Sequence, residues 1–171
     1  MATNKIYYAP GTIITFRGAG GGDVLWTMQN EGTAKGRISN VWDRGAGSLP
    51  SRYLWRCTTR WVATPTLGDC LRLYLATSSA SATAALADGG LTFGDAELTT
   101  ENALLLNCIP LGGVTAEAID KSFCSSGIIA IYERYVALAG WNGSGTKAMT
   151  NTVTDHVVTF TPIPDDIQAA T

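Results

Sequence analysis

The sequence has few of the residues on which most catalytic and metal sites depend. It contains one histidine, and only 15% of its 171 residues are charged. Any histidine-based acid, base or metal role must rest on His156, whose position beside Asp155 favours a strand histidine bonded to its neighbour. No G-x-S-x-G nucleophile turn is present. The cysteines form no C-x-x-C or Cys/His ligand pattern, which argues against zinc. We therefore expect a protein that is not an enzyme and holds no metal or cofactor.

A basic excess and long apolar runs are also missing. Twelve basic residues stand against fourteen acidic ones, giving a formal charge of −2, which argues against nucleic acid as a direct partner. No apolar run approaches the roughly 20 residues needed to cross a bilayer, so we expect no membrane insertion. The N-terminus lacks the apolar stretch of a secretory signal, which favours a reducing site of synthesis. Mostly buried free thiols are then favoured over two disulfides, an alternative left open, for Cys57, Cys70, Cys108 and Cys124.

Alternation of apolar and polar residues is the main structural signal in the sequence. It is clearest over 52–62, where the apolar side chains of one face are Tyr53, Trp55, Cys57 and Trp61. The other face carries Arg52, Arg56 and Arg60. A second run over 70–75 places its leucines inward and Arg72 and Tyr74 outward, and the two runs predict a hairpin.

Weaker alternation recurs along the rest of the chain, over 12–17, 23–28, 36–42, 106–111, 127–131, 134–141 and 156–161. Glycine-rich turns separate these runs. The pattern predicts an all-β fold: a single β-sandwich or jelly-roll-like domain of about eight or nine antiparallel strands, with at most one short helix, over 98–106. We expect an N-terminal arm over 1–11, the sandwich over 12–161 and a Pro-rich tail over 162–171. Because proline cannot donate a ladder hydrogen bond, the last strand should stop near Thr161.

Two sets of side chains are candidates for binding. Arg52, Arg56, Arg60 and Arg72 are predicted to share one sheet face, as a solvated surface or as a docking surface for an acidic partner. Trp42 and Trp141 lie near strand ends beside glycine-rich turns and are candidate exposed aromatics that could stack on sugar rings. Carbohydrate is therefore one candidate ligand.

The C-terminal part of the sequence carries a recognisable pattern. It runs Arg134-Tyr-Val-Ala-Leu-Ala-Gly-Trp-Asn142, then Gly143-Ser-Gly145, then Asp155-His-Val-Val-Thr-Phe-Thr-Pro-Ile-Pro-Asp-Asp-Ile-Gln168. This ending resembles that of small structural proteins of tailed bacteriophage virions. Looser similarity extends to Gly36-Arg-Ile-Ser39, Asp43-Arg-Gly45 and Leu71-Arg-Leu-Tyr-Leu-Ala76, so that the resemblance covers about half the chain.

The resemblance implies a non-enzymatic virion protein that decorates or cements the capsid shell. Such a protein is made in the host bacterial cytoplasm, resides on the capsid surface and binds the major capsid protein or other virion proteins. It implies a homo-oligomer, with a trimer favoured, whose many copies raise the apparent affinity. The N-terminal arm, with Lys5, Tyr7 and Tyr8, and the C-terminal tail are candidate attachment segments. The alternatives are a tail or fibre-associated module and a carbohydrate-binding β-sandwich.

Overall fold

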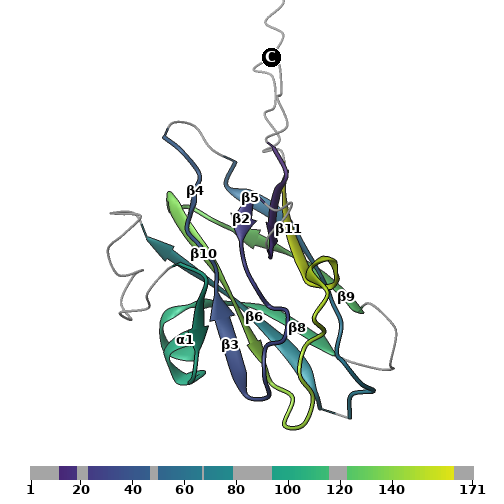
Figure 1. The fold of residues 1–171 in the computed structure, drawn as a ribbon. Coiled ribbons are helices and arrows are strands. Elements are labelled where there is room, and N and C mark those ends of the chain that lie inside the picture. The colour runs from purple at the N-terminus through teal and green to yellow at the C-terminus, as the bar shows by residue number, and fades with distance from the viewer. Residues whose placement is uncertain are drawn as a thin grey trace, which may run out of the picture.

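Two packed β-sheets make up the part of the chain that the computed structural model describes, residues 12–18, 23–46, 50–66, 68–78, 94–115 and 123–163 (Figure 1). The five-stranded sheet has the order β2 (Val24–Leu25), β1 (Ile14–Arg17), β11 (Val157–Ile163), β5 (Arg52–Thr59) and β9 (Phe123–Ala130). The six-stranded sheet has the order β7 (Ala96–Leu98), β3 (Lys35–Ile38), β10 (Tyr135–Asn142), β6 (Cys70–Ser78) and β8 (Ile109–Thr115), and β4 (Trp42–Asp43) also pairs with β10. The predicted all-β sandwich is confirmed.

The order of the longer strands is that of a jelly roll. The pairs are nested along the chain: β1 pairs with β11, β3 with β10, β5 with β9 and β6 with β8, all antiparallel. Such nesting arises when one long antiparallel ribbon rolls up so that its halves lie in two facing sheets. The predicted eight or nine strands correspond to these eight and to the short β2, which lies in the predicted run over 23–28, and the described residues add the short β4 and β7. One pair, β1 with β2, is parallel rather than antiparallel.

The predicted hairpin between residues 52–62 and 70–75 is wrong. β5 lies in the five-stranded sheet and β6 in the six-stranded sheet, because residues 60–69 carry the chain from one layer to the other. This connection is longer than the two to five residues of ordinary hairpin loops. Asp69 shapes its end: its carboxylate accepts hydrogen bonds from the Thr66 backbone N–H at 2.7 Å and hydroxyl at 2.9 Å.

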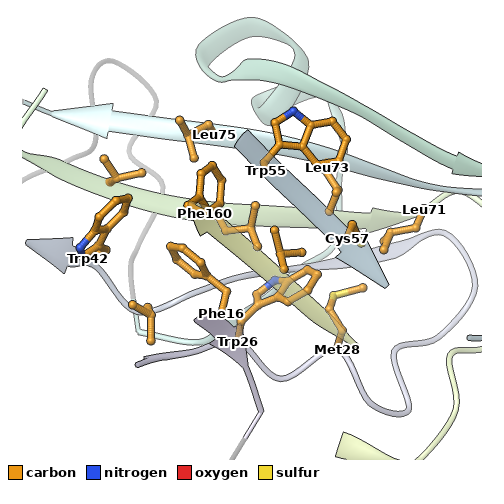
Figure 2. Packing of buried hydrophobic residues seen from close by; sticks show 14 of the residues in the cluster. Phe16, Trp26, Met28, Trp42, Trp55, Cys57, Leu71, Leu73, Leu75 and Phe160 are labelled. Atoms are coloured by element: carbon orange, nitrogen blue, oxygen red, sulfur yellow. The ribbon is translucent and has the colours of Figure 1, made fainter. Parts of the chain in front are cut away.

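The main core fills the space between the two sheets (Figure 2). The inward residues of β5 meet those of β6, as the alternation predicts, but on β6 the outward Tyr74 is buried as well, because it belongs to a second cluster. An aromatic group joins the layers at one end: Phe16 lies edge-on to Phe160 at 5.5 Å and to Trp42 at 6.2 Å between ring centroids. Burial of each large apolar side chain contributes about 1.5–3 kcal/mol.

A second apolar cluster covers the outer side of the six-stranded sheet. It consists of Ile38, Tyr74, Ala76, Leu104, Ala137, Ala139 and Trp141. Leu104 belongs to the short helix α1 (Asn102–Asn107), which overlaps the helix predicted over 98–106 but begins later and includes Asn107. The helix is at lower left in Figure 1. With core on one side and this cluster on the other, β10 is buried at every position from Val136 to Asn142.

The last strand is longer than the sequence predicts. β11 runs through Pro162, which pairs with Tyr53, and ends at Ile163. Pairing with β1 ends at Phe160, which faces Ile14, so β11 has a ladder partner on only one side at Pro162. A proline has no backbone N–H. It is tolerated at this position because β11 needs no hydrogen-bond donor on its unpaired side.

The cysteine side chains that the structure describes, Cys57, Cys70 and Cys108, form no disulfide, as the sequence favours; Cys57 is buried and the other two are half-buried. Within the described ranges, no helix is long and apolar enough to cross a membrane.

Candidate functional site

The outer face of the five-stranded sheet is the candidate site. Residues that pair across strands share a face, so the register defines its rows. One row joins Thr159, Arg56 and Ser126, the next joins Thr161, Leu54 and Ile128, and the third joins Ile163, Arg52 and Ala130. We call these nine residues of β11, β5 and β9 the arginine face.

Apolar side chains lie exposed at the centre of the arginine face. Leu54 is 42% exposed and Ile128, directly opposite it on β9, is 61% exposed. Arg52 and Arg56, also exposed, flank Leu54 two residues away on either side. Side chains two residues apart in a strand are about 6.6–6.8 Å apart, so the two arginines bracket an aliphatic pair across about 13 Å.

The charge of the five-stranded sheet has one sign. Its strands carry Arg17, Arg52 and Arg56 and no aspartate or glutamate. Carboxylates near the sheet lie off the strands: Asp23 accepts a 2.8 Å hydrogen bond from the Thr15 backbone N–H beside β2, and Asp155 precedes β11. The face therefore combines two exposed arginines with an apolar centre and several hydroxyl groups.

The other two arginines predicted for this face have different surroundings. Arg60 follows the end of β5 and is half-buried. Arg72 is on β6, and the prediction that it shares a face with the others is wrong. It points outward from the opposite sheet, where its Nη1 lies 2.9 Å from Glu101 Oε2. The error follows from the hairpin prediction, since β5 and β6 belong to different layers.

The prediction that Trp42 and Trp141 are exposed is also wrong. Trp42 is 9% exposed and packs edge-on against Tyr53, with ring centroids 5.6 Å apart. Trp141 is 6% exposed and covers Gly36 on the neighbouring β3, where a Cβ atom would come within 2.8 Å of the indole. Gly36 therefore makes room for the Trp141 ring to pack against the sheet. Neither ring offers a platform for a sugar.

His156 is buried, and both of its ring nitrogens lie within hydrogen-bond distance of threonine oxygens. Its Nδ1 lies 2.9 Å from Thr59 Oγ1, and its Nε2 lies 3.1 Å from both the carbonyl and the hydroxyl oxygen of Thr150. The expected bond to Asp155 is not direct: that carboxylate accepts the Thr150 hydroxyl at 2.7 Å. Burial is the largest influence on His156 and lowers its pKa. These contacts connect the end of β5, the loop that contains Thr150 and the residue before β11.

The remaining predicted positions lie outside the described residues. They are Lys5, Tyr7 and Tyr8 of the arm and residues 164–171 of the tail. Ile14 of β1 pairs with Phe160 of β11, so the chain enters β1 and leaves β11 at the same end of the sheet, on neighbouring strands.

Leu54 and Ile128 are the residues that the sequence-based list of binding candidates missed. The alternation that predicts an outward Arg52 and Arg56 also predicts an outward Leu54, so Leu54 could have been found from the sequence. Ile128 could not, because only the strand register shows which face of β9 it occupies. In the described ranges, no group of three or more His, Cys, Asp or Glu side chains could hold a metal ion. No protein-family model matches the sequence, and comparison with curated proteins gives no match either.

Proposed function

We propose that this chain is a non-enzymatic virion structural protein that binds a bacteriophage capsid shell as a decoration or cement protein and stabilises it. The arginine face is the observation that carries this proposal. An exposed aliphatic pair framed by arginines, on a sheet without acidic residues, suits attachment to another protein surface. It offers no cavity or paired acid and base for turnover of a small substrate.

The resemblance of the C-terminal sequence to phage virion proteins supports the same function independently of the arginine face. Its segments are β10 and β11, which lie inside the two sheets rather than at their edges. The resemblance therefore concerns the framework of the domain. A jelly-roll framework is used by viral capsid proteins and by lectins, so the choice between them depends on the surface.

The carbohydrate alternative has lost its two candidate residues, because Trp42 and Trp141 are buried. Attachment to a tail or fibre remains the neighbouring hypothesis, since it needs the same kind of surface. Imaging of bound particles separates shell from tail.

Binding to capsids tests the proposal. The purified chain is mixed with emptied or expanded capsids that lack it, and bound protein is separated by sedimentation. We expect a fixed number of copies per shell and a higher temperature of shell disruption than in untreated capsids. Simultaneous binding of many copies allows each contact to be modest.

Two outcomes would overturn the proposal. The first is no binding to any capsid form by a chain whose far-ultraviolet circular dichroism shows folded β structure. The second is binding that saturates without a fixed stoichiometry and leaves the disruption temperature unchanged.

A further inference from the structure

We infer that β9 is an interaction edge at which two copies of this chain pair, antiparallel across a two-fold axis, so that their five-stranded sheets become one continuous sheet. The inference goes beyond the proposed function, because the contact forms between free chains and needs no capsid.

Four strands lie at the ends of the two described sheets, and three of them carry features that oppose pairing with another chain. β2 has two residues, and β7 has three, with the charged Glu97 in the middle. β8 contains Pro110, which has no N–H to donate, and its register with β6 shifts between Leu73 and Tyr74. Short length, charge, proline and bulges are the means by which natural proteins protect exposed edges.

The fourth of these strands, β9, has none of the protecting features. It runs for eight residues, from Phe123 to Ala130, without a proline or a charged side chain. Each of its residues pairs with β5 with no shift in register. On its other side β9 has no ladder partner among the described strands, and β8, which follows the same margin of the sandwich, belongs to the other sheet. Alternate N–H and C=O groups of β9 therefore point to the side where another extended strand can add.

A second copy of β9 fits this edge. A two-fold axis between antiparallel strands places outward residues opposite outward residues, because side chains alternate with a period of two. Ile128, which is 61% exposed, can then lie opposite Ile128 of the second copy. The row of Leu54 and Ile128 continues into its own image, and four aliphatic side chains lie side by side. In the same register the half-buried Ile129 lies opposite Gly127 of the second copy, which has no side chain to displace.

Charge does not oppose this contact. The outward arginines Arg52 and Arg56 are on β5, one strand in from the edge. Across the pair the two β5 strands are three strand spacings apart, about 14 Å. That distance exceeds the Debye length of about 8 Å at physiological ionic strength, so repulsion between the two sets of arginines is largely screened. The result holds whatever contacts these arginines make within their own chain.

The inferred contact closes at two copies. Identical edges related by a two-fold axis are both occupied in the pair, so a third chain cannot join at β9. The resemblance to phage virion proteins instead favours a trimer. The number of copies therefore distinguishes pairing at β9 from assembly through another surface. Edge pairing also leaves the outer face of each sheet uncovered, so the same face can still meet a capsid.

Sedimentation equilibrium of the full chain tests the contact. We expect a concentration-dependent species with twice the 18.0 kDa mass of one chain. Ile128→Lys places two like charges opposite each other at the centre of the pair and should weaken association about tenfold or more. Val62→Lys is the matched control, since Val62 is a similarly exposed aliphatic residue, at 54%, outside the strands. It should leave association unchanged, and circular dichroism checks that both variants are folded.

A mixture of two variants tests whether the occupant is a second copy. Ile128→Lys and Ile128→Glu should each associate weakly alone and should associate with each other when mixed, because opposite charges then face each other across the axis. Hydrogen exchange followed by mass spectrometry tests the backbone pairing. Amides of residues 126–130 should exchange more slowly as the concentration of the wild-type chain rises, and those of Ile128→Lys should not.

Any of four results contradicts the inference. The first is a wild-type chain that stays monomeric up to about 1 mM. The second is a trimer as the associated species. The third is a dimer that Ile128→Lys weakens no more than Val62→Lys does, and the fourth is a mixture of the Lys and Glu variants that associates no better than either variant alone.

Discussion

The Tyr74 hydroxyl donates a 2.6 Å hydrogen bond to Glu101 Oε1, and this contact ties the residue that precedes α1 to the middle of the six-stranded sheet. Nη1 of Arg72 lies 2.9 Å from the other carboxylate oxygen. The Glu101 side chain is mostly buried, so the loss of either partner leaves a desolvated carboxylate oxygen uncompensated. Burial, followed by this carboxylate, raises the pKa of Tyr74.

Removing the Tyr74 hydroxyl tests the importance of this contact. Tyr74→Phe keeps the ring within its apolar cluster and should lower the free energy of unfolding by about 1.5–3 kcal/mol, the range for hydrogen bonds to charged groups. Urea unfolding followed by tryptophan fluorescence measures the change. Tyr132→Phe is the matched control, since Tyr132 is 82% exposed and its change should stay within about 0.5 kcal/mol. Equal stability of the two variants would show that the bond to Glu101 contributes nothing.

Gly127 makes room for the Trp55 indole at the edge of the sandwich. A Cβ atom at Gly127 would lie 2.7 Å from Trp55 Nε1, and the same ring approaches Gly112 on the opposite sheet. Gly127→Ala should therefore destabilise the protein by about 1–3 kcal/mol through overpacking. Thermal unfolding by calorimetry provides the measurement.

The control for this substitution is Gly113→Ala. A Cβ there meets only the Leu71 carbonyl oxygen at 3.7 Å, an ordinary contact, so the loss of chain entropy in the unfolded state should make the variant neutral or slightly stabilised. In a Trp55→Phe background the smaller ring leaves space, and the cost of Gly127→Ala should shrink. An undiminished cost would mean that the clash with Trp55 is not its cause.

His156 makes the stability of the protein sensitive to acid. Its pKa in the folded state lies below the unfolded value of about 6.5, because burial disfavours the charged ring. The unfolded chain therefore binds the proton more readily. The contribution of the neutral histidine is complete above about pH 6.5 and is lost as the pH falls below this value toward the folded pKa.

Chemical unfolding at about pH 8 and about pH 5 measures this loss in the wild-type chain and in His156→Gln. The variant should be less stable at the higher pH, and the gap between the two proteins should narrow at the lower pH. Glu31, whose pKa is raised by burial, titrates in both proteins and cancels in the comparison. A gap that stays constant would exclude His156 as the titrating group.

The sequence was sufficient to predict the fold class and the inward and outward faces of the best strands. Alternation placed Trp55 and Cys57 in the core and Arg52 and Arg56 outside, because a half-buried strand has a period of two whatever its partner is. It could not predict which strands pair. The segment between β5 and β6 resembles a hairpin turn in the sequence. That it instead connects the two sheets depends on which strands pair, and alternation carries no information about pairing.

The candidate site shows the same limit. Arg72 alternates as regularly as Arg56, yet it belongs to the other sheet and is paired with Glu101. Trp42 and Trp141 stand near glycine-rich turns in the sequence, yet both rings are buried, and Trp141 packs over Gly36 of a different strand. The exposed Leu54–Ile128 pair joins residues far apart in the chain, and only the strand register brings them together.

Arg44 is buried without an acidic partner among the described residues. Its planar guanidinium is instead satisfied by several uncharged acceptors at once. It donates hydrogen bonds to the carbonyl oxygens of Glu133 and Pro50 and to the Tyr53 hydroxyl, and it stacks 5.2 Å from the centroid of the Tyr53 ring. These contacts connect the segment after β4, the start of β5 and the turn before β10. A lysine has no planar fork and cannot serve all of these acceptors at once.

We therefore expect Arg44→Lys to lower the free energy of unfolding by about 2–3 kcal/mol, since partly buried carbonyl groups lose charged donors. Arg134→Lys is the matched control. Arg134 forms a two-fold hydrogen-bonded ion pair with Asp43 at 2.7 and 2.8 Å, but both side chains are more than two-fifths exposed. The control should lose less than about 1 kcal/mol, as exposed ion pairs do. Urea unfolding of both variants at one pH measures the two changes in the free energy of unfolding. If Arg44→Lys lowers it no more than Arg134→Lys does, the hydrogen bonds to Glu133 and Pro50 do not stabilise the contact between these segments.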